Sequence, residues 1–451
     1  MLIKKNIRIK ISSKLFYSVI IISLVAFLYS CSSIKKEKSF NWGYYIDKAN
    51  TDESQVPQYK LPDVLVTEEG EVVKNRLTWL QKRRSEILEL YKNEIYGRVP
   101  QWNGSVEFKT TKEIPNSLND KATMKEVTAS FINKGDTVKM NVLIYLPNDG
   151  KEKHPLFVGL NFFGNHTVCP DTNITIVNGY VINKKAINVK NHKSTEAKRG
   201  VMKERWQVEK LIDKGYGLAT IFYGDLDPDF DDGFQNGIHP LFYKEGQTKP
   251  KDNEWGSISA WAWGLSRAMD YFETDSTINE NKIAVVGHSR LGKAALWAGA
   301  QDKRFAITIS NNSGSGGAAL FRRKFGETID VSVAYAPQWY CDNFKKYVDN
   351  ENKLPIDQHM LISLIVPRAV YIASAEEDTW ADPKGEFLSA KYATPVYNLF
   401  NKKGIESDKM FELNQPTMNS VGYHIRSGKH DLTEYDWNNY INFADKHYFV
   451  K

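Results

Sequence analysis

The chain has 451 residues, of which 41% are hydrophobic and 25% are charged, the balance of an ordinary globular protein. Five of the six units of its formal net charge of +6 lie in residues 1–31, which hold five basic and no acidic side chains, so removing them leaves +1. A nearly neutral protein has no electrostatic basis for binding nucleic acid, and that class of function is excluded. The 11 Trp, 23 Tyr and 22 Phe residues suit either a large aromatic core or a surface that stacks on sugar rings.

The N-terminus predicts an export signal. A basic stretch precedes an apolar run that is shorter than the ~20 residues of a membrane-spanning helix. The residues Leu28-Tyr29-Ser30-Cys31 resemble a bacterial lipobox, in which the peptidase cleaves before the cysteine and its thiol carries lipid. We therefore expect a lipoprotein signal peptide over 1–30, a tether and N-terminal wrap over 31–75, and a catalytic domain over 76–451. An uncleaved membrane anchor is the alternative.

Strands and helices alternate along most of the remaining chain. Apolar spacing predicts a helix over 76–97, and two β-rich runs joined by Asn133-Lys134-Gly135-Asp136 predict a hairpin over 125–147. We then predict strands over 154–162, 216–225, 282–289, 305–312, 368–374 and 421–431. Helices are predicted over 204–215, 257–273, 291–301, 357–366, 384–400 and 434–449. This alternation predicts a parallel sheet covered by helices on both faces, and the long polar connection over 163–203 is expected to be functional.

A serine stands at the corner between one of these strands and the helix after it, in Gly287-His288-Ser289-Arg290. In an α/β-hydrolase this strained corner exposes the nucleophilic Oγ at the positive end of the helix. Gly287 is placed as the turn requires, but Leu291 takes the place of the usual second glycine and Gly292 follows one residue later. We predict an α/β-hydrolase, a three-layer αβα sandwich with a mostly parallel central sheet, and Ser289 as its nucleophile. A structural serine is the alternative.

A serine hydroxyl needs an imidazole to take its proton and a carboxylate to orient that imidazole. The chain order of this fold is serine, acid, histidine. Of the late histidines, His430 follows a strand and is the predicted base, whereas His424 falls inside that strand and His447 falls near the end of the last helix. The loop AEEDTWADP supplies the acid, for which Asp378 is the prediction and Glu377 the alternative.

Four segments together resemble the glucuronoyl esterases, a family of carbohydrate esterases. They are GHSRLGKAA, SNNSGSGGAAL, SAEEDTWADP and GYHIRSGKHD, and the resemblance spans roughly residues 75–451. It implies that Arg290 stabilises the oxyanion and that Lys293, Glu327 and Trp380 bind the sugar. As alternatives, Glu327 could pair with a neighbouring arginine at the surface and Trp380 could belong to the core.

One position departs from the pattern of the resembled family. Many members carry the acid early, as a glutamate, at the place that Asn312 occupies here. An amide cannot stabilise an imidazolium as a carboxylate does. The departure assigns the acid role to Asp378.

The resemblance implies an exported serine esterase that cleaves the ester of (4-O-methyl-)glucuronic acid on glucuronoxylan, including esters with lignin alcohols. We expect no cofactor and no metal, a monomer, and lipid anchoring through Cys31 to a bacterial membrane, in the periplasm or at the cell surface. An acetyl-xylan or other carbohydrate esterase and a non-catalytic glycan-binding lipoprotein are the alternatives. The two remaining cysteines, Cys169 and Cys341, are as well suited to pairing as to two buried thiols.

Overall fold

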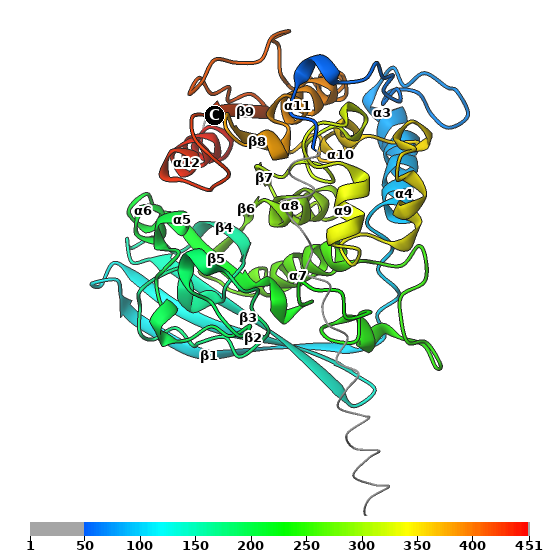
Figure 1. Ribbon diagram of the computed structural model, residues 1–451. Helices are drawn as coiled ribbons and strands as arrows, with labels where there is room; N and C mark the ends of the chain where they lie inside the picture. Colours follow the sequence, from blue (N-terminus) through cyan, green and yellow to red (C-terminus); the bar gives the residue numbers. More distant parts are fainter. Residues whose placement is uncertain (1–48, 450–451) are drawn as a thin grey trace, which may run out of the picture. The chain divides into compact units, whose positions relative to one another are not determined.

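The computed structural model describes residues 49–449, and Figure 1 shows a sheet with helices on both of its sides. The sheet has nine strands in the order β1-β2-β3-β5-β4-β6-β7-β8-β9. Their bounds are β1 (Ser105–Ser117), β2 (Ala122–Asn133), β3 (Asp136–Pro147), β4 (His154–Asn161), β5 (Gly217–Phe222), β6 (Ile278–His288), β7 (Ile307–Asn311), β8 (Ala369–Ala375) and β9 (Val421–Arg426). The pairs from β1 to β5 are antiparallel and those from β5 to β9 are parallel, which confirms the mostly parallel sheet.

Helices cover both faces of the sheet. Their bounds are α3 (Arg76–Thr78), α4 (Arg84–Glu94), α5 (Lys203–Trp206), α6 (Val208–Asp213), α7 (Ser257–Phe272), α8 (Arg290–Gln301), α9 (Ile329–Tyr335), α10 (Gln358–Ser363), α11 (Pro383–Asn398) and α12 (Glu434–Tyr448). Apolar residues of α4, α7, α8, α10 and α11 share one core, and those of α6 and α12 share a second. Strand residues alternate between the two: Val285 of β6 lies in the first core, Ala284 and Val286 in the second. These two cores make the three-layer sandwich.

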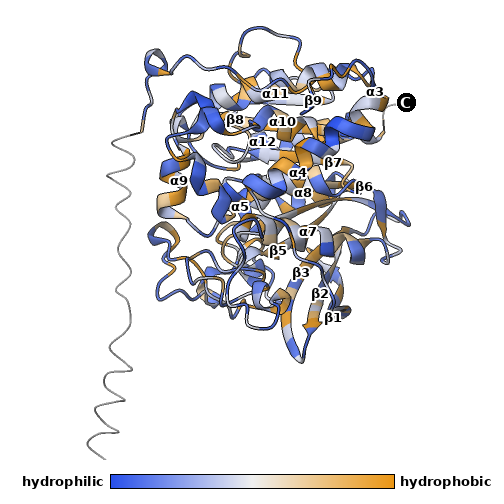
Figure 2. Cartoon of the chain, turned by 90° about the vertical axis from the view of Figure 1, so that its right-hand side faces the viewer, coloured by the Kyte–Doolittle hydropathy of each residue, from blue (hydrophilic) through white to orange (hydrophobic). Residues whose placement is uncertain are grey.

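Hydrophobic residues are concentrated where these layers meet. Figure 2 shows them around α4 and α8 in the middle of the protein, whereas the loops at its periphery are hydrophilic. No helix within residues 49–449 is both long and apolar enough to cross a membrane.

The structure differs from the sequence prediction at four elements. The helix expected over 76–97 consists of α3, a π-helical segment over Trp79–Arg83 and α4, and it ends at Glu94. Strand β1 was not predicted because it lies at the sheet edge, where its polar residues are exposed in alternation with partly buried ones. The short helix α9 was also not predicted. The helix expected over 204–215 is divided into α5 and α6, because Gln207 between them adopts a left-handed conformation with φ 46°.

Two segments outside the regular elements are held against the sandwich. In the N-terminal wrap, Glu53 forms ion pairs with Arg323 and Lys384, while Val64 and Val73 are buried. The polar connection between β4 and α5 packs inward around His166, which is fully buried and shares a 2.9 Å hydrogen bond with Ser194 Oγ. Residues 1–48, which include the predicted signal peptide and Cys31, lie outside the described part of the chain.

Candidate active site

Ser289 occupies a strained corner between β6 and α8. Its φ of 59° and ψ of −133° place it in a region that non-glycine residues seldom adopt. The corner depends on two glycines: a Cβ on Gly287 would lie 2.0 Å from the carbonyl oxygen of Leu291, and one on Gly292 would lie 3.0 Å from that of Gly287. The displaced second glycine therefore still serves the turn, one residue later than in the usual pattern.

The hydroxyl of Ser289 is not used by the structure around it. Ser289 is the N-cap of α8, yet its side chain does not cap the helix and has no hydrogen bond to any residue of 49–449. The first N–H groups of a helix have no acceptor within the helix and carry a partial positive charge. Oγ thus stands beside backbone donors that are suited to a developing oxyanion.

His430 and Asp378 meet although 52 residues separate them in sequence. His430 Nδ1 lies 2.6 Å from Asp378 Oδ2; the histidine side chain is 39% exposed and the carboxylate side chain 3%. His430 comes from the loop after β9, and Asp378 comes from the loop after β8, which is the adjacent parallel strand. The neighbouring Glu377 is exposed, so the structure brings Asp378, and not Glu377, to the ring.

The other two late histidines lie elsewhere. His424 is fully buried between Tyr371 and Asp436, with a hydrogen bond on each ring nitrogen. His447 is half-buried near the end of α12. The ring of His430, in contrast, lies 4.5 Å from the ring of His288, the residue directly before Ser289.

His288 is a second imidazole at this corner, and the sequence analysis did not assign it a role. Its Nδ1 lies 2.6 Å from Asn311 Oδ1. Burial, followed by the proximity of His430, holds the pKa of His288 well below its ordinary value of 6.5. His288 therefore stays neutral near pH 7 and places no second positive charge beside a protonated His430.

Asn312 contacts the predicted acid directly. Its Nδ2 donates a 2.8 Å hydrogen bond to Asp378 Oδ2, the oxygen that also faces His430. The backbone after it is held by the buried Glu386, whose Oε1 accepts the N–H groups of Ser313 and Gly314 at 2.8 and 3.0 Å. Asn312 is thus hydrogen-bonded to the carboxylate that also meets His430.

Arg290 extends from the first turn of α8 and is held by a carboxylate and aromatic rings. It forms an ion pair with the buried Asp229, and its guanidinium carbon lies 4.7 Å from the ring of Trp339 and 5.8 Å from that of Phe162. Burial alone would lower the pKa of Arg290, but the charge of Asp229 outweighs it and the pKa is raised. Arg290 therefore keeps its positive charge next to Ser289.

Lys293 lies one helical turn farther along α8 and forms a buried ion pair with Glu327. Their charged atoms are 2.7 Å apart, and the two side chains are 2% and 4% exposed. Glu327 also accepts hydrogen bonds from Ser332 Oγ at 2.8 Å and Tyr335 OH at 2.7 Å, while Lys293 Nζ lies 4.9 Å from the Trp339 ring. Glu327 does not pair with the arginines next to it: Arg322 pairs with Asp357, and Arg323 with Glu53 and Asp382.

Trp380 is half-buried in the loop that carries Asp378. Its carbonyl oxygen accepts the backbone N–H of Glu327 at 2.9 Å, which ties this loop to the Lys293–Glu327 pair. Gly326 permits the approach: with φ +62°, it has no room for a Cβ, which would lie 2.4 Å from that carbonyl. Of the four residues that the resemblance assigned to the oxyanion and the sugar, Arg290 and Lys293 therefore follow Ser289 in α8, and Trp380 follows Asp378 in a loop that is hydrogen-bonded to Glu327.

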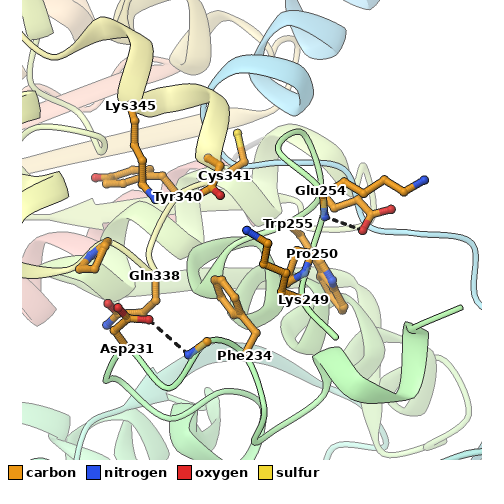
Figure 3. Close-up of a pocket in the computed structure, with 14 residues that line it drawn as sticks. Asp231, Phe234, Lys249, Pro250, Glu254, Trp255, Gln338, Tyr340, Cys341 and Lys345 are labelled. Carbon is orange, nitrogen blue, oxygen red and sulfur yellow. Dashed lines mark hydrogen bonds and ion pairs between the residues drawn. The ribbon is translucent and has the colours of Figure 1, made fainter. Parts of the chain in front are cut away.

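A cavity of about 160 Å³ lies next to this cluster, between the segments 231–255 and 337–345. Figure 3 shows Phe234, Trp255 and Tyr340 around it. Gln338 lines it and also donates a 3.3 Å hydrogen bond from Nε2 to Asp229, the partner of Arg290. No group of three His, Cys, Asp or Glu residues within 49–449 is arranged to hold a metal ion, and Cys169 and Cys341 are free and buried.

Several residues of this site could not be identified from sequence. Asp229, Gln338 and Trp339 come from irregular segments, and Glu386 comes from within a helix predicted for its apolar spacing. Only their contacts relate them to Arg290 and Asp378. A signal did exist for His288, because it is adjacent to the nucleophile in sequence.

Known proteins with similar sequences and structures identify the family. The family described as glucuronyl esterase, fungi, matches residues 240–401. Carbohydrate esterase MZ0003 from an unknown prokaryotic organism is 50% identical over 398 residues, which are 88% of this chain and 92% of that protein.

Two solved structures share the fold closely. A promiscuous CE15 esterase from a marine bacterial metagenome has a TM-score of 0.83 and 50% identity, and a glucuronoyl esterase from Solibacter usitatus has a TM-score of 0.83 and 47% identity. Each match covers 88% of this chain and 100% of the other. The chain thus belongs to the glucuronoyl esterases of carbohydrate esterase family 15.

Proposed function

We propose that this protein hydrolyses the ester formed by the carboxyl group of (4-O-methyl-)glucuronic acid on glucuronoxylan. The observation that carries the proposal is the 2.6 Å His430–Asp378 hydrogen bond beside the Ser289 corner. A base held in one orientation next to an unoccupied serine hydroxyl is the arrangement of acyl transfer. The membership of the chain in the glucuronoyl esterase family indicates that the acid part of the ester is a glucuronic acid.

The first half of the reaction makes an acyl-enzyme. His430 accepts the proton of Ser289 through Nε2, because Nδ1 is committed to Asp378, and Oγ attacks the ester carbon. Asp378 stabilises the imidazolium that forms. The tetrahedral intermediate then collapses when His430 passes the proton to the alcohol oxygen, which leaves. Within residues 49–449 the Oγ atom has no hydrogen-bond partner, and catalytic hydrogen bonds often tighten only when substrate binds.

The second half repeats these steps with water. His430 takes a proton from water, the hydroxide attacks the acyl carbon, and Ser289 recovers its proton as the leaving group. The uronic acid is released as a carboxylate. Asp378 remains ionised throughout and keeps the ring in the tautomer that both halves require.

Arg290 and the start of α8 stabilise the oxyanion. The carbonyl oxygen becomes negative in both tetrahedral intermediates, and a fixed cation at that position lowers the barrier without moving. Because Asp229 and Trp339 hold the guanidinium, Arg290 needs no rearrangement when the charge appears. Because the Arg290 guanidinium is already ordered, little conformational entropy is lost when the oxyanion forms.

Lys293, Glu327 and Trp380 support recognition of the sugar. A lysine and a glutamate together offer donors and acceptors for hydroxyl groups, and an indole gives a pyranose face a surface to stack on. The Lys293–Glu327 pair is buried and further fixed by Ser332 and Tyr335, so its polar atoms are pre-positioned. Such a pair suits an acid component that carries several hydroxyl groups.

The test compares benzyl glucuronate with an acetylated xylose ester, with Ser289→Ala as control. We expect rapid hydrolysis of the glucuronate ester, slow or no hydrolysis of the acetyl ester, and no turnover by the variant. Faster release of acetate would favour an acetyl-xylan or other carbohydrate esterase. Hydrolysis of neither ester, with intact oligosaccharide binding by both proteins, would favour a glycan-binding lipoprotein.

We further infer that the protein is exported and anchored to a bacterial membrane through a lipid on Cys31. The support is the basic and apolar N-terminal run followed by Leu28-Tyr29-Ser30-Cys31. Mass spectrometry of the membrane fraction should find a lipidated N-terminal cysteine, and Cys31→Ser should abolish the modification. An unmodified protein that keeps residues 1–30 would instead indicate an uncleaved anchor.

A further inference from the structure

The long connection between β4 and α5 contains a concentration of positive charge that the esterase reaction does not use. Residues 180–199 hold six basic side chains, five lysines and Arg199, against one acidic side chain, Glu196. The chain from residue 32 onward has a net charge of only +1, so the rest of it is slightly negative. Charge of one sign gathered on one segment of a nearly neutral protein creates a local field that attracts anions.

The lysines of this segment are available to an external ligand. Arg199 and Glu196 form an ion pair with each other. None of the five lysines forms an ion pair with any residue of 49–449, so their charge is not neutralised within the described chain. Four of them are exposed and are called the lysine cluster below, namely Lys184, Lys185, Lys190 and Lys193.

Backbone hydrogen bonds gather the lysine cluster on one closed loop. The N–H of Val181 donates to the carbonyl oxygen of His192 at 3.0 Å. Within that loop, Lys184 and Val189 exchange two backbone hydrogen bonds at 3.2 and 3.0 Å. The first three lysines lie between Val181 and His192 in sequence, and Lys193 follows directly. The four ammonium groups therefore belong to one folded turn and not to an extended segment.

The base of this loop packs against a segment of the active site. Tyr180 stacks on His192, with ring centroids 4.4 Å apart, and the ring of Phe230 also lies 4.4 Å from Tyr180. Phe230 directly follows Asp229, the carboxylate that holds Arg290. The loop that carries the lysine cluster is thus fixed one residue away from the partner of the oxyanion group.

The ester itself is not the anion that this charge attracts. Esterification removes the negative charge of a glucuronic acid, so a neutral ester gains little from the lysine cluster. A glucuronic acid with a free carboxyl group is a carboxylate near pH 7, and a polysaccharide chain carries such groups at positions that are not esterified. Complementary charge across a binding surface speeds the encounter and favours one alignment of the two partners.

We propose that the lysine cluster binds free uronate carboxylates of the polysaccharide and so directs the protein to esters on segments rich in free glucuronic acid. The proposal rests on the proposed function and adds a second recognition element outside the reaction centre at Ser289. An anionic membrane surface is the other partner that four exposed lysines suit. The polysaccharide is favoured, because a bilayer against a loop that is fixed beside the partner of Arg290 would hinder a polymer from reaching the site.

Binding is tested first in a protein that cannot turn over. In the Ser289→Ala background, the dissociation constant of a de-esterified glucuronoxylan oligosaccharide should rise about tenfold from low to high salt. Changing all four lysines of the cluster to glutamine should raise it about tenfold at low salt and remove most of the salt dependence. Calorimetry measures both values. A neutral xylo-oligosaccharide of the same length carries no carboxylate, and its binding should not respond to the four substitutions.

The matched control changes four lysines elsewhere on the surface to glutamine. They are also exposed and without an ion pair inside the described chain, namely Lys109, Lys139, Lys402 and Lys409. This variant has the same change in net charge as the cluster variant. Its dissociation constant and salt dependence should equal those of the protein with the intact cluster. Circular dichroism melting curves check that both quadruple variants are folded.

Kinetics with Ser289 intact separate the lysine cluster from the reaction centre. Benzyl glucuronate is small and uncharged, so its kcat/KM should be the same in the cluster variant and the wild type. An oligosaccharide with one esterified and several free uronates should lose about tenfold in kcat/KM at low salt, mainly through KM. At high salt the variant and the wild type should converge.

Four outcomes would overturn the proposal: oligosaccharide binding that does not depend on the cluster, an equal loss in the control variant, an equal loss of kcat/KM on benzyl glucuronate, or weaker binding of the cluster variant to phosphatidylglycerol vesicles alone. The last outcome would assign the lysines to a membrane surface. If the wild type hydrolyses neither ester, the proposed function fails. Carboxylate binding by the lysine cluster is measured without turnover, so the two failures are distinguishable.

Discussion

Two histidine–aspartate pairs lie close to the end of strand β9, and they differ in the exposure of the histidine. His424, inside β9, meets Asp436 at 2.9 Å, and both side chains are 0% exposed. His430, four residues beyond the strand, meets Asp378 at 2.6 Å and is 39% exposed. Both ring nitrogens of His424 have partners, because Nδ1 faces Tyr371. A histidine–carboxylate contact therefore does not make a base; an available nitrogen next to a nucleophile does.

The environments of the two carboxylates differ as well. Asp436 is shared by His424, Arg426 and the first turn of α12, where Thr433 completes a capping box. Burial raises the pKa of Asp436, but the hydrogen bond and charge of His424, with the charge of Arg426, outweigh it and lower the pKa overall. This carboxylate fixes a helix to the sheet. The carboxylate of Asp378 meets the side chains of Asn312 and His430. It can therefore orient the imidazole ring without also anchoring a helix to the sheet.

Removing His430, the exposed histidine of the two, should have the largest effect on the reaction rate. His430→Ala leaves Ser289 without a base, and we expect kcat on benzyl glucuronate to fall by about 10⁶-fold, as for removal of a triad histidine. The melting temperature should hardly change, because the ring is partly exposed. Steady-state kinetics and calorimetry measure both quantities. Activity within tenfold of the wild type would show that His430 is not the base.

Asp378→Asn should reduce kcat by about 10⁴-fold, because an amide favours the wrong tautomer of the histidine. Glu377→Gln is the matched control: it makes the same change one residue earlier, on an exposed side chain, and should stay near wild type. If Glu377→Gln is the damaging substitution, the acid has been assigned one residue too late.

A substitution in the buried His424–Asp436 pair should lower the stability of the protein and leave its reaction rate nearly unchanged. His424→Ala leaves Asp436 buried without one of its partners, and breaking a buried pair in this way costs about 3–5 kcal/mol of unfolding free energy. We expect kcat/KM at 25 °C to stay within about threefold of wild type, since His424 contacts no active-site residue. Urea unfolding monitored by fluorescence gives the free energy. A loss of activity without a loss of stability would reverse the roles of the two histidines.

The sequence was sufficient to predict a candidate site residue where a reactive side chain directly follows a predicted strand. The serine corner, the late acid and His430 each follow a predicted strand, and parallel strands bring their carboxyl ends to one edge of the sheet. The sequence already indicated that His424 is a packing residue, because it falls within the strand, and the structure buries it with both ring nitrogens hydrogen-bonded. In contrast, Asp229, Trp339 and Glu386 come from loops or distant helices. Their contacts with Arg290 and with the segment after Asn312 depend on tertiary packing, which no local pattern encodes.

A third buried carboxyl, Glu386, should give a pH dependence opposite to that of Asp436. Burial is the main cause that raises the pKa of Glu386 to about 8, and the charge of Asp378 adds to it. The folded protein holds this proton more tightly than the unfolded chain, where the ordinary value is 4.5. Its contribution to stability is therefore complete below pH 4.5 and is lost as pH rises toward 8.

Glu386→Gln tests this contribution, because it keeps the shape of the side chain and removes the titration. Urea unfolding between pH 5 and pH 8 should show a smaller decrease of stability in the variant than in the wild type. The Asp436 carboxylate, whose pKa is lowered, loses its contribution only as pH falls below its ordinary value of 3.8, outside this range. Parallel slopes in the two proteins would show that Glu386 does not carry the titration.

The smallest effect is expected at Asn312, where the loop after β7 meets the loop after β8. Asn312→Ala removes one hydrogen bond to Asp378 Oδ2, and we expect kcat to fall by about tenfold or less, in line with the ~1 kcal/mol of such a bond. Asn312→Glu should be tolerated, because the pattern of the resembled family places the acid at this position. Combined with Asp378→Asn, it should restore part of the lost rate, since the new carboxylate starts from a position already in contact with residue 378. If the double variant is no faster than Asp378→Asn and Asn312→Glu alone is also inactive, residue 312 no longer points toward His430, and its contact with Asp378 serves only to position that acid.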